Sequence, residues 1–127
     1  MTISVSSAKA KGRKLQQWVR DLILATWPKL EAGDVRSTSM GSNGEDLQLS
    51  PAARQRFPYS IECKARASIG IYSFYDQAKA NAGKHEPLLI VRANRRNALV
   101  VVDAEHFIKL IKQLDKNDRT RASSARG

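Results

Sequence analysis

The sequence predicts a single α/β domain in which a mixed central β-sheet of about five strands is flanked by helices. The length of 127 residues suffices for one hydrophobic core but not for two domains. Hydrophobic residues make up 42% of the chain, a share typical of globular proteins. Helix-like and strand-like segments follow in the order helix, three strands, helix, two strands, helix. We therefore expect a folded domain over residues 12–115, between a flexible basic arm at 1–11 and a flexible tail at 116–127.

Three segments have the apolar periodicity of amphipathic helices. The first begins at Arg13 and ends before Pro28, because the residue before a proline is disfavoured in a helix. The second covers residues 73–82 and the third covers residues 104–114. Each should bury one apolar stripe: Leu15, Trp18, Val19, Leu22 and Ile23 in the first, Phe74, Ala78 and Ala82 in the second, and Phe107, Leu110, Ile111 and Leu114 in the third.

The strand-like segments are residues 33–40, 46–50, 57–65, 87–93 and 97–103. A basic loop is expected at residues 51–56. Segment 57–65 is the most informative, because its side chains alternate between two chemical types. One face should pack on the core and the other should border a cleft or solvent, with Phe57, Tyr59, Ile61 and Cys63 on the first and Ser60, Glu62 and Lys64 on the second.

The charge of the chain points to a polyanionic partner. Lys and Arg number 22 against 12 Asp and Glu, which gives a formal net charge of +10. Each basic side chain that meets a phosphate also releases condensed counterions, so such a charge favours nucleic acid. The charge does not distinguish DNA from RNA. A protein that binds ribosomal RNA, or a basic protein whose charge only confers solubility, would have a similar net charge.

Cysteine content and hydropathy limit the cellular compartments in which the protein is expected. Cys63 is the single cysteine, so neither an intrachain disulfide nor a cysteine zinc cluster can form. No apolar run approaches the ~18 residues of a membrane span. The first residues lack the hydrophobic core of a secretion signal. We expect a cytoplasmic protein with no membrane partner.

Three residues form a candidate catalytic set. Glu62 and Lys64 are two apart on a predicted strand, so both side chains face the same way, about 7 Å apart. Asp46 begins a preceding strand, and if the strands pair the two carboxylates can meet on one ion. Carboxylates with a backbone carbonyl and waters form the oxygen shell that Mg²⁺ or Mn²⁺ prefers, and such an ion can activate water toward a phosphodiester. A solvated strand face with a local ion pair between Glu62 and Lys64 is the alternative interpretation.

Four stretches together resemble a known family. The segments KGRKLQ (11–16), DVRSTSMGSNGEDLQL (34–49), YSIECKARASIGIY (59–72) and YDQA (75–78) are similar in order and spacing to the archaeal-type Holliday junction resolvases, which have viral members. These enzymes belong to the PD-(D/E)xK nucleases. The resemblance covers Lys11 to Ile111 and leaves both ends outside it.

The resemblance implies a role for several residues. Asp46 and Glu62 would be the metal carboxylates, Cys63 would offer its backbone carbonyl to the Mg²⁺ or Mn²⁺ ion, and Lys64 would be the catalytic lysine. Gln77 would lie beside the active site. Ser39 and Ser42 lie where the family has a mobile serine-containing segment near the scissile strand, and either could correspond to its serine.

Two positions depart from the family pattern. The family has a glutamate four residues after the glycine of the first helix, where this chain has Gln16. Glutamine can ligate a metal or hold a metal-bound water, but it brings no charge, which puts a second metal in doubt and leaves room for an inactive relative. Glu45 stands where the family has a proline before Asp46.

The expected DNA-binding surface combines basic side chains with a few polar and aromatic ones. It consists of Lys11, Arg13, Lys14, Arg36, Ser39, Ser42, Arg54, Arg56, Arg66 and Tyr72. For Arg95 and Arg96, a phosphate contact and an ordinary solvated surface are equally favoured. The resemblance further implies a homodimer, since two symmetric cuts resolve a four-way junction. A related nuclease with another DNA target and a non-catalytic nucleic-acid-binding protein remain alternatives.

Overall fold

The structure is a computed structural model that describes residues 5–38 and 44–126, with the side chains of 7–38 and 44–117. Its helices are α1 (Val5–Thr26), the 3-10 turn η1 (Ala32–Asp34), α2 (Pro51–Arg56), α3 (Ile71–Ala82) and α4 (Ala104–Arg126). Its strands are β1 (Val35–Ser37), β2 (Leu47–Leu49), β3 (Tyr59–Arg66), β4 (Glu86–Ala93) and β5 (Leu99–Val101). The predicted α/β class with about five strands is therefore confirmed.

The prediction of one central sheet is wrong, because the strands form two sheets. β1 and β2 make an antiparallel hairpin, while β3, β4 and β5 make a mixed sheet in that order. β3 and β4 run parallel from Tyr59 opposite Glu86 to Arg66 opposite Ala93, and β5 pairs antiparallel with β4. The parallel pair requires a crossover, which α3 supplies.

The hairpin meets the free edge of β3 at one point. The Asp46 N–H donates to the Ile61 carbonyl at 2.9 Å. The next N–H on that edge, from Cys63, donates instead to the Asp46 carboxylate at 2.8 Å. A side chain thus takes the place of a strand carbonyl, so the ladder does not continue and the two sheets stay separate.

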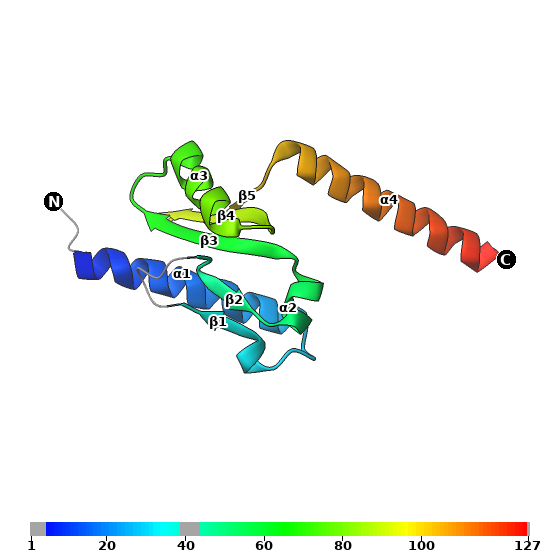
Figure 1. Ribbon diagram of the computed structural model, residues 1–127, viewed down its shortest axis with the longest axis horizontal. Coiled ribbons are helices and arrows are strands. Elements are labelled where there is room, and N and C mark those ends of the chain that lie inside the picture. Colours follow the sequence, from blue (N-terminus) through cyan, green and yellow to red (C-terminus); the bar gives the residue numbers. More distant parts are fainter. Residues whose placement is uncertain (1–4, 39–43, 127) are drawn as a thin grey trace.

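The three-stranded sheet lies between two covering layers, with α1 and the hairpin on one face and α3 on the other (Figure 1). The larger core lies on the α1 side and includes Leu15, Val19 and Ile23 of α1 with Val35, Leu47, Ile61, Cys63, Leu88 and Ile90 of the strands. A smaller core on the α3 side contains Ala78, Leu89 and Val91. Burial on both faces explains why β3 and β4 are almost continuously buried, as parallel strands usually are.

The second face of β3 is therefore not open to solvent along its length. Ser60 and Glu62 are 2% and 6% exposed under α3, and Lys64 is half-buried. The expectation of a cleft holds only where Glu62 and Lys64 border the cavity described below, because α3 covers the rest.

Three elements differ from their expected bounds. α1 begins at Val5 rather than Arg13, because the intervening Ala and Lys residues favour a helix. The expected basic loop at 51–56 is helix α2, whose first turn begins with Pro51 and is capped by Ser50, which accepts the Ala53 N–H at 3.1 Å. α4 continues to Arg126 through a segment without proline or glycine, where a flexible tail was expected.

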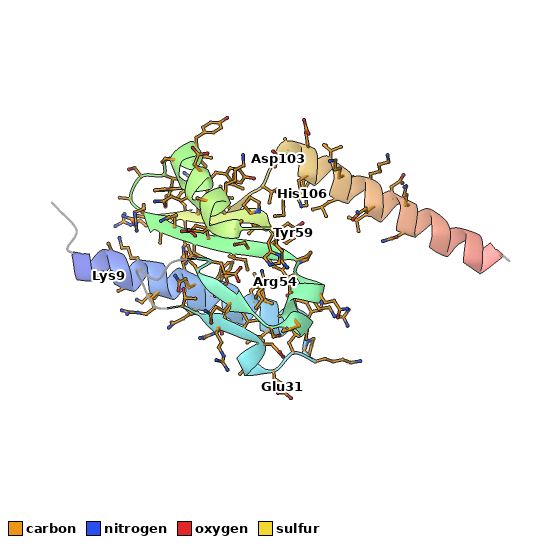
Figure 2. The ribbon with its side chains drawn as sticks, in the orientation of Figure 1. Lys9, Glu31, Arg54, Tyr59, Asp103 and His106 are labelled. Carbon is orange, nitrogen blue, oxygen red and sulfur yellow. The ribbon has the colours of Figure 1, made fainter. Side chains whose placement is uncertain are left out.

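The expected burial of the last helix is wrong for three of its four apolar positions. α4 extends away from the rest of the molecule (Figure 1), and Phe107, Ile111 and Leu114 are 49%, 46% and 59% exposed. Its first turns are anchored: Leu110 packs against the larger core, and His106 Nε2 and the Tyr59 hydroxyl are 2.8 Å apart (Figure 2). Two apolar positions of the α1 stripe, Trp18 and Leu22, are likewise about half exposed. Among the described helices, none is both long and apolar enough to cross a membrane.

Candidate active site

A cavity of about 390 Å³ opens where the hairpin meets the edge of β3. Six of the residues predicted for the site or its DNA contacts line it together, namely Asp46, Glu62, Cys63, Lys64, Arg66 and Gln77. They come from the start of β2, from β3 and from α3, so the fold unites residues that are up to thirty-one positions apart in sequence. Gly12 of α1 and Gly44 of the hairpin line the cavity from the other side.

Asp46 is fixed by the backbone of β3. Its Oδ2 accepts the Cys63 N–H at 2.8 Å, and its carbonyl accepts from the Thr38 hydroxyl at 2.9 Å. Among the described residues no donor is found on its other oxygen, Oδ1. One oxygen therefore orients the side chain, while the other remains available to a ligand in the cavity.

Glu62 has weaker partners. The Lys64 ammonium lies 3.5 Å from its Oε1, and the Asn81 side-chain amide donates to Oε2 at 3.4 Å. Both distances are long for interactions with a carboxylate. A cation entering the cavity could displace either partner at small cost.

The ionised carboxylates of Asp46 and Glu62 repel each other in the absence of a cation. Burial is the main cause that raises the pKa of Glu62, and the nearby charge of Asp46 adds to it, against the opposing effect of Lys64. Burial also raises the pKa of Asp46, although the Cys63 N–H and Lys64 act in the other direction. A divalent cation between two such groups would relieve both the repulsion and the desolvation.

These donors fit a hard divalent cation such as Mg²⁺ or Mn²⁺. Asp46 and Glu62 would hold it through carboxylate oxygens, and the cavity leaves room for water to complete the shell. Within the described part of the chain, no group of three or more His, Cys, Asp or Glu side chains could share an ion. The set is therefore a two-carboxylate one.

Lys64 is held next to these carboxylates. Its ammonium lies 3.5 Å from Glu62 and 5.4 Å from the centre of the Phe74 ring, and its side chain is 16% exposed. Phe74 of α3 thus limits the positions that the Lys64 side chain can adopt. The ion pair between Glu62 and Lys64 is the one expected for an ordinary solvated strand face. Such a strand face does not require the cavity that these two residues also line.

Gln16 lies close to the site without lining the cavity. It is 2% exposed on α1, one turn after Gly12, and its side-chain carbonyl accepts from the Ser37 hydroxyl at 2.5 Å. This hydrogen bond ties α1 to β1. Gln16 therefore connects the helix that carries Gly12 to the hairpin that carries Asp46.

Four residues that line the site were not predicted as site residues, namely Gly12, Gly44, Ala80 and Asn81. Asn81 donates to Glu62 from the last turn of α3, four residues after Gln77, and this helical spacing could have identified it. Gly12 belongs to the KGRKLQ stretch, where it marked only the position of Gln16.

The predicted DNA-binding residues fall into separate places. Arg13 and Arg36 line a groove of about 740 Å³ between α1 and β1, together with Arg20, Gln17 and Thr38. Lys11 and Lys14 line a smaller pocket on the other side of α1. Arg56 is exposed at the end of α2. Tyr72 is 86% exposed in the first turn of α3 rather than on a preceding loop, and Ser39 and Ser42 lie outside the described residues.

Arg54 has a different position from the one expected. Its guanidinium donates to both Glu45 carboxylate oxygens, at 3.0 and 2.5 Å, and to the Tyr59 carbonyl at 2.7 Å. Both side chains of the ion pair are about 20% exposed. Arg54 thus connects α2 to the residue before Asp46 and to the start of β3, which is a structural role.

The Cys63 side chain belongs to the core, as expected. The thiol is buried among the apolar residues under α1, and burial together with the charges of Asp46 and Glu62 raises its pKa far above the ordinary value. A thiolate nucleophile is therefore excluded in the folded protein.

Comparison of this chain with known protein families, with curated proteins and with solved structures found no match.

Proposed function

We propose that this protein is a divalent-metal-dependent nuclease that hydrolyses phosphodiester bonds of DNA. The observation that carries the proposal is the meeting of Asp46, Glu62 and Lys64 in one cavity. A buried carboxylate from Glu62, a half-buried one from Asp46 and a lysine, in a chain with a net charge of +10, combine a site for a cation with an attraction for a polyanion.

Each residue then has a defined task. Asp46 and Glu62 would hold the cation, which would supply Lewis acidity and lower the pKa of water. Lys64, beside Glu62 at the same cavity, would donate to the phosphate oxygen on which negative charge develops. Gln77 and Arg66 line the same cavity and orient the phosphodiester by hydrogen bonds.

The basic groove between α1 and β1 supports binding of the DNA backbone beside the site. Arg13, Arg20 and Arg36 line it, and Ser37 and Thr38 at its end lead to the hairpin that carries Asp46. A strand that follows this groove would reach the cavity. The groove gives the nucleic acid a direction across α1.

We further propose a four-way DNA junction as the substrate and a pair of identical subunits as the active form. The proposal follows from the resemblance to junction resolvases, and a two-fold pair would offer two equivalent sites for paired cuts. A continuous apolar surface supports the pairing: Trp18, Leu22, Leu99 and Val100, each about half exposed or more, line an open groove of about 220 Å³. The proposal includes a reducing, cytoplasmic compartment, which suits the free Cys63.

Cleavage of labelled DNA tests the proposal. The wild-type chain should cut a synthetic four-way junction in Mg²⁺ or Mn²⁺, cut the matching duplex more slowly, and be inactive in chelator. Asp46→Asn and Glu62→Gln should each abolish cleavage and leave DNA affinity equal or higher, because negative charge near the phosphates is removed. Sustained wild-type turnover in either variant would overturn the assignment.

The same assay separates the other candidate function. Gln16 and the absence of a third acidic ligand among the described residues favour a nucleic-acid-binding protein without catalysis. That protein would bind DNA in chelator, would show no metal-dependent rise in melting temperature, and would leave every substrate intact.

A further inference from the structure

A second basic cavity lies at the carboxyl ends of β3 and β4, separate from the candidate active site. Four basic side chains line it, Lys11 and Lys14 of α1, Arg92 of β4 and Arg95 of the turn after β4. The remaining lining residues are Leu15, Ala65, Ala93 and Asn94, so no acidic residue lines this cavity. Its volume of about 230 Å³ suits a compact anionic group.

The lining of this cavity has one sign of charge. Four like charges from three elements repel one another around the cavity, and no carboxylate in its lining offsets them. The basic groove between α1 and β1 differs in this respect, because Asp21 lines it and pairs with Arg20 at 2.9 Å. The lining of the cavity therefore contains basic side chains without a carboxylate, whereas the lining of the groove contains both.

Several hydrogen bonds hold the basic residues in place before any ligand binds. The Lys11 ammonium donates to the Asn94 side chain at 2.9 Å, which ties α1 to the turn after β4. The Arg92 Nε–H donates to the Arg96 carbonyl at 3.2 Å. Such ties reduce the entropy lost when the side chains meet a ligand.

The turn also contains an unusual backbone conformation. Arg95 has a φ of 61°, which makes it the one residue other than glycine with a positive φ in the described part of the chain. Side chains with a Cβ disfavour this left-handed region, where glycine and asparagine are the common residues. Arginine at this position therefore has a conformational cost that a role for its side chain in the cavity would explain.

The cavity lies across the sheet from the candidate active site. On β3, Lys64 and Arg66 border the active-site cavity, while Ala65 between them lines the basic one. On α1, Gly12 lines the first and the adjacent Lys11 lines the second. A polymer with regularly spaced phosphates could therefore reach both around the same turn of α1.

We propose that Lys11, Lys14, Arg92 and Arg95 form a second phosphate site, which holds the backbone of the same nucleic acid at a point remote from the bond that is cut. The inference rests on the proposed function in its choice of ligand, because it assigns the anion to a nucleic-acid backbone. It adds Arg92 and Arg95 to the binding surface and gives the chain two anchoring points on opposite sides of the sheet.

The test uses the full chain with the double substitution Arg92→Gln/Arg95→Asn and the control Lys29→Gln/Lys84→Gln, which also removes two exposed basic charges. Affinity for a fluorescent DNA duplex is measured by anisotropy in chelator, between about 50 and 200 mM salt. The double variant should bind about tenfold or more weakly than the wild type. The slope of log affinity against log salt should fall by about 0.9 for each phosphate that the variant no longer neutralises. The control should match the wild type within about twofold, because neither Lys29 nor Lys84 lines the active-site cavity, the basic cavity or the basic groove.

A second readout separates binding from folding. Arg95→Asn alone should melt at the same temperature as the wild type or higher, since asparagine accepts the left-handed conformation more readily. A double variant with unchanged affinity and slope would overturn the proposal. Loss of stabilisation by inorganic phosphate in the double variant, with DNA binding unchanged, would also overturn it and leave a small-anion pocket. A lower affinity and slope in the double variant, with no cleavage by the wild type, would support the second site and end the nuclease assignment instead.

Discussion

Removing the Arg54 side chain should destabilise the fold far more than removing its neighbour Arg56. Both arginines lie in the last turn of α2, so the two substitutions to alanine change the helix and its dipole in the same way. Only Arg54 bridges elements, through two hydrogen bonds to Glu45 and one to the Tyr59 carbonyl. Arg54→Ala leaves a largely buried carboxylate and a buried carbonyl without these donors.

The magnitude follows from the burial of the pair. Breaking a fully buried ion pair costs about 3–5 kcal/mol, and the exposure of about 20% on each side reduces this to about 2–4 kcal/mol. An unfolding entropy of about 2.1 cal/mol/K per residue gives about 0.27 kcal/mol/K for 127 residues, so the melting temperature should fall by about 7–15 °C. Arg56→Ala should change the stability by less than about 0.5 kcal/mol, or about 2 °C.

The assay is thermal or urea unfolding of the two variants, of Glu45→Ala and of the double variant Arg54→Ala/Glu45→Ala. The double variant should lose about 1–3 kcal/mol less than the sum of its two single substitutions, because one leaves a charge that the other removes. Equal losses for Arg54→Ala and Arg56→Ala, or strict additivity of Arg54→Ala and Glu45→Ala, would refute the structural role of Arg54. Arg54 would then remain a candidate for DNA binding, as the sequence predicted.

Three further outcomes are expected at the candidate site. In chelator, the raised pKa of the Glu62 carboxyl should make the fold most stable below pH 4.5, the ordinary pKa of a glutamate, and this contribution should be lost as pH rises through the folded pKa. Glu62→Gln should flatten this part of the curve of stability against pH, measured by urea unfolding from acid to neutral pH. Lys64→Met should lower the cleavage rate by about 10²-fold or more with little effect on Mg²⁺ affinity, and an unchanged rate would remove Lys64 from the chemistry. Gln16→Glu should tighten Mg²⁺ or Mn²⁺ binding measured by calorimetry if its side chain can turn from Ser37 to the cavity, whereas lower stability with unchanged metal affinity would limit its role to the contact with Ser37.

The sequence predicted the elements that have strong local signals. The alternation of residues 57–65 identified β3 and placed Ile61 and Cys63 in the core. It did not show that α3 would cover the other face, because parallel pairing with β4 joins residues more than twenty-five positions apart. The amphipathic pattern of α4 was real, but the pattern alone cannot tell whether another part of the same chain packs against it.

At the candidate site, too, the sequence predicted the local features but not the long-range contacts. The spacing of Glu62 and Lys64 on a strand was enough to place both beside one cavity, and Asp46 joined them through the hairpin. Arg54 was placed on the DNA-binding surface because its charge is visible in the sequence, while its partner Glu45 is nine positions away and reaches it only through the turn of α2. The sequence alone does not show whether a carboxylate will pair with a given basic residue.

The separation of the two carboxylates onto different sheets has a consequence for motion. Asp46 belongs to the hairpin and Glu62 to the three-stranded sheet. The hairpin packs on the larger core, and the two hydrogen bonds of Asp46 described above join its backbone and side chain to the edge of β3. Local opening of the hairpin would therefore divide the site while β3 and β4 stay paired. A cation held by both carboxylates would be lost in that open form, so its binding would slow hydrogen exchange at the hairpin amides by the factor 1 + [L]/Kd and leave the amides of β4 unchanged. The backbone amides of β1 and β2 would then act as a local reporter of whether the site is filled.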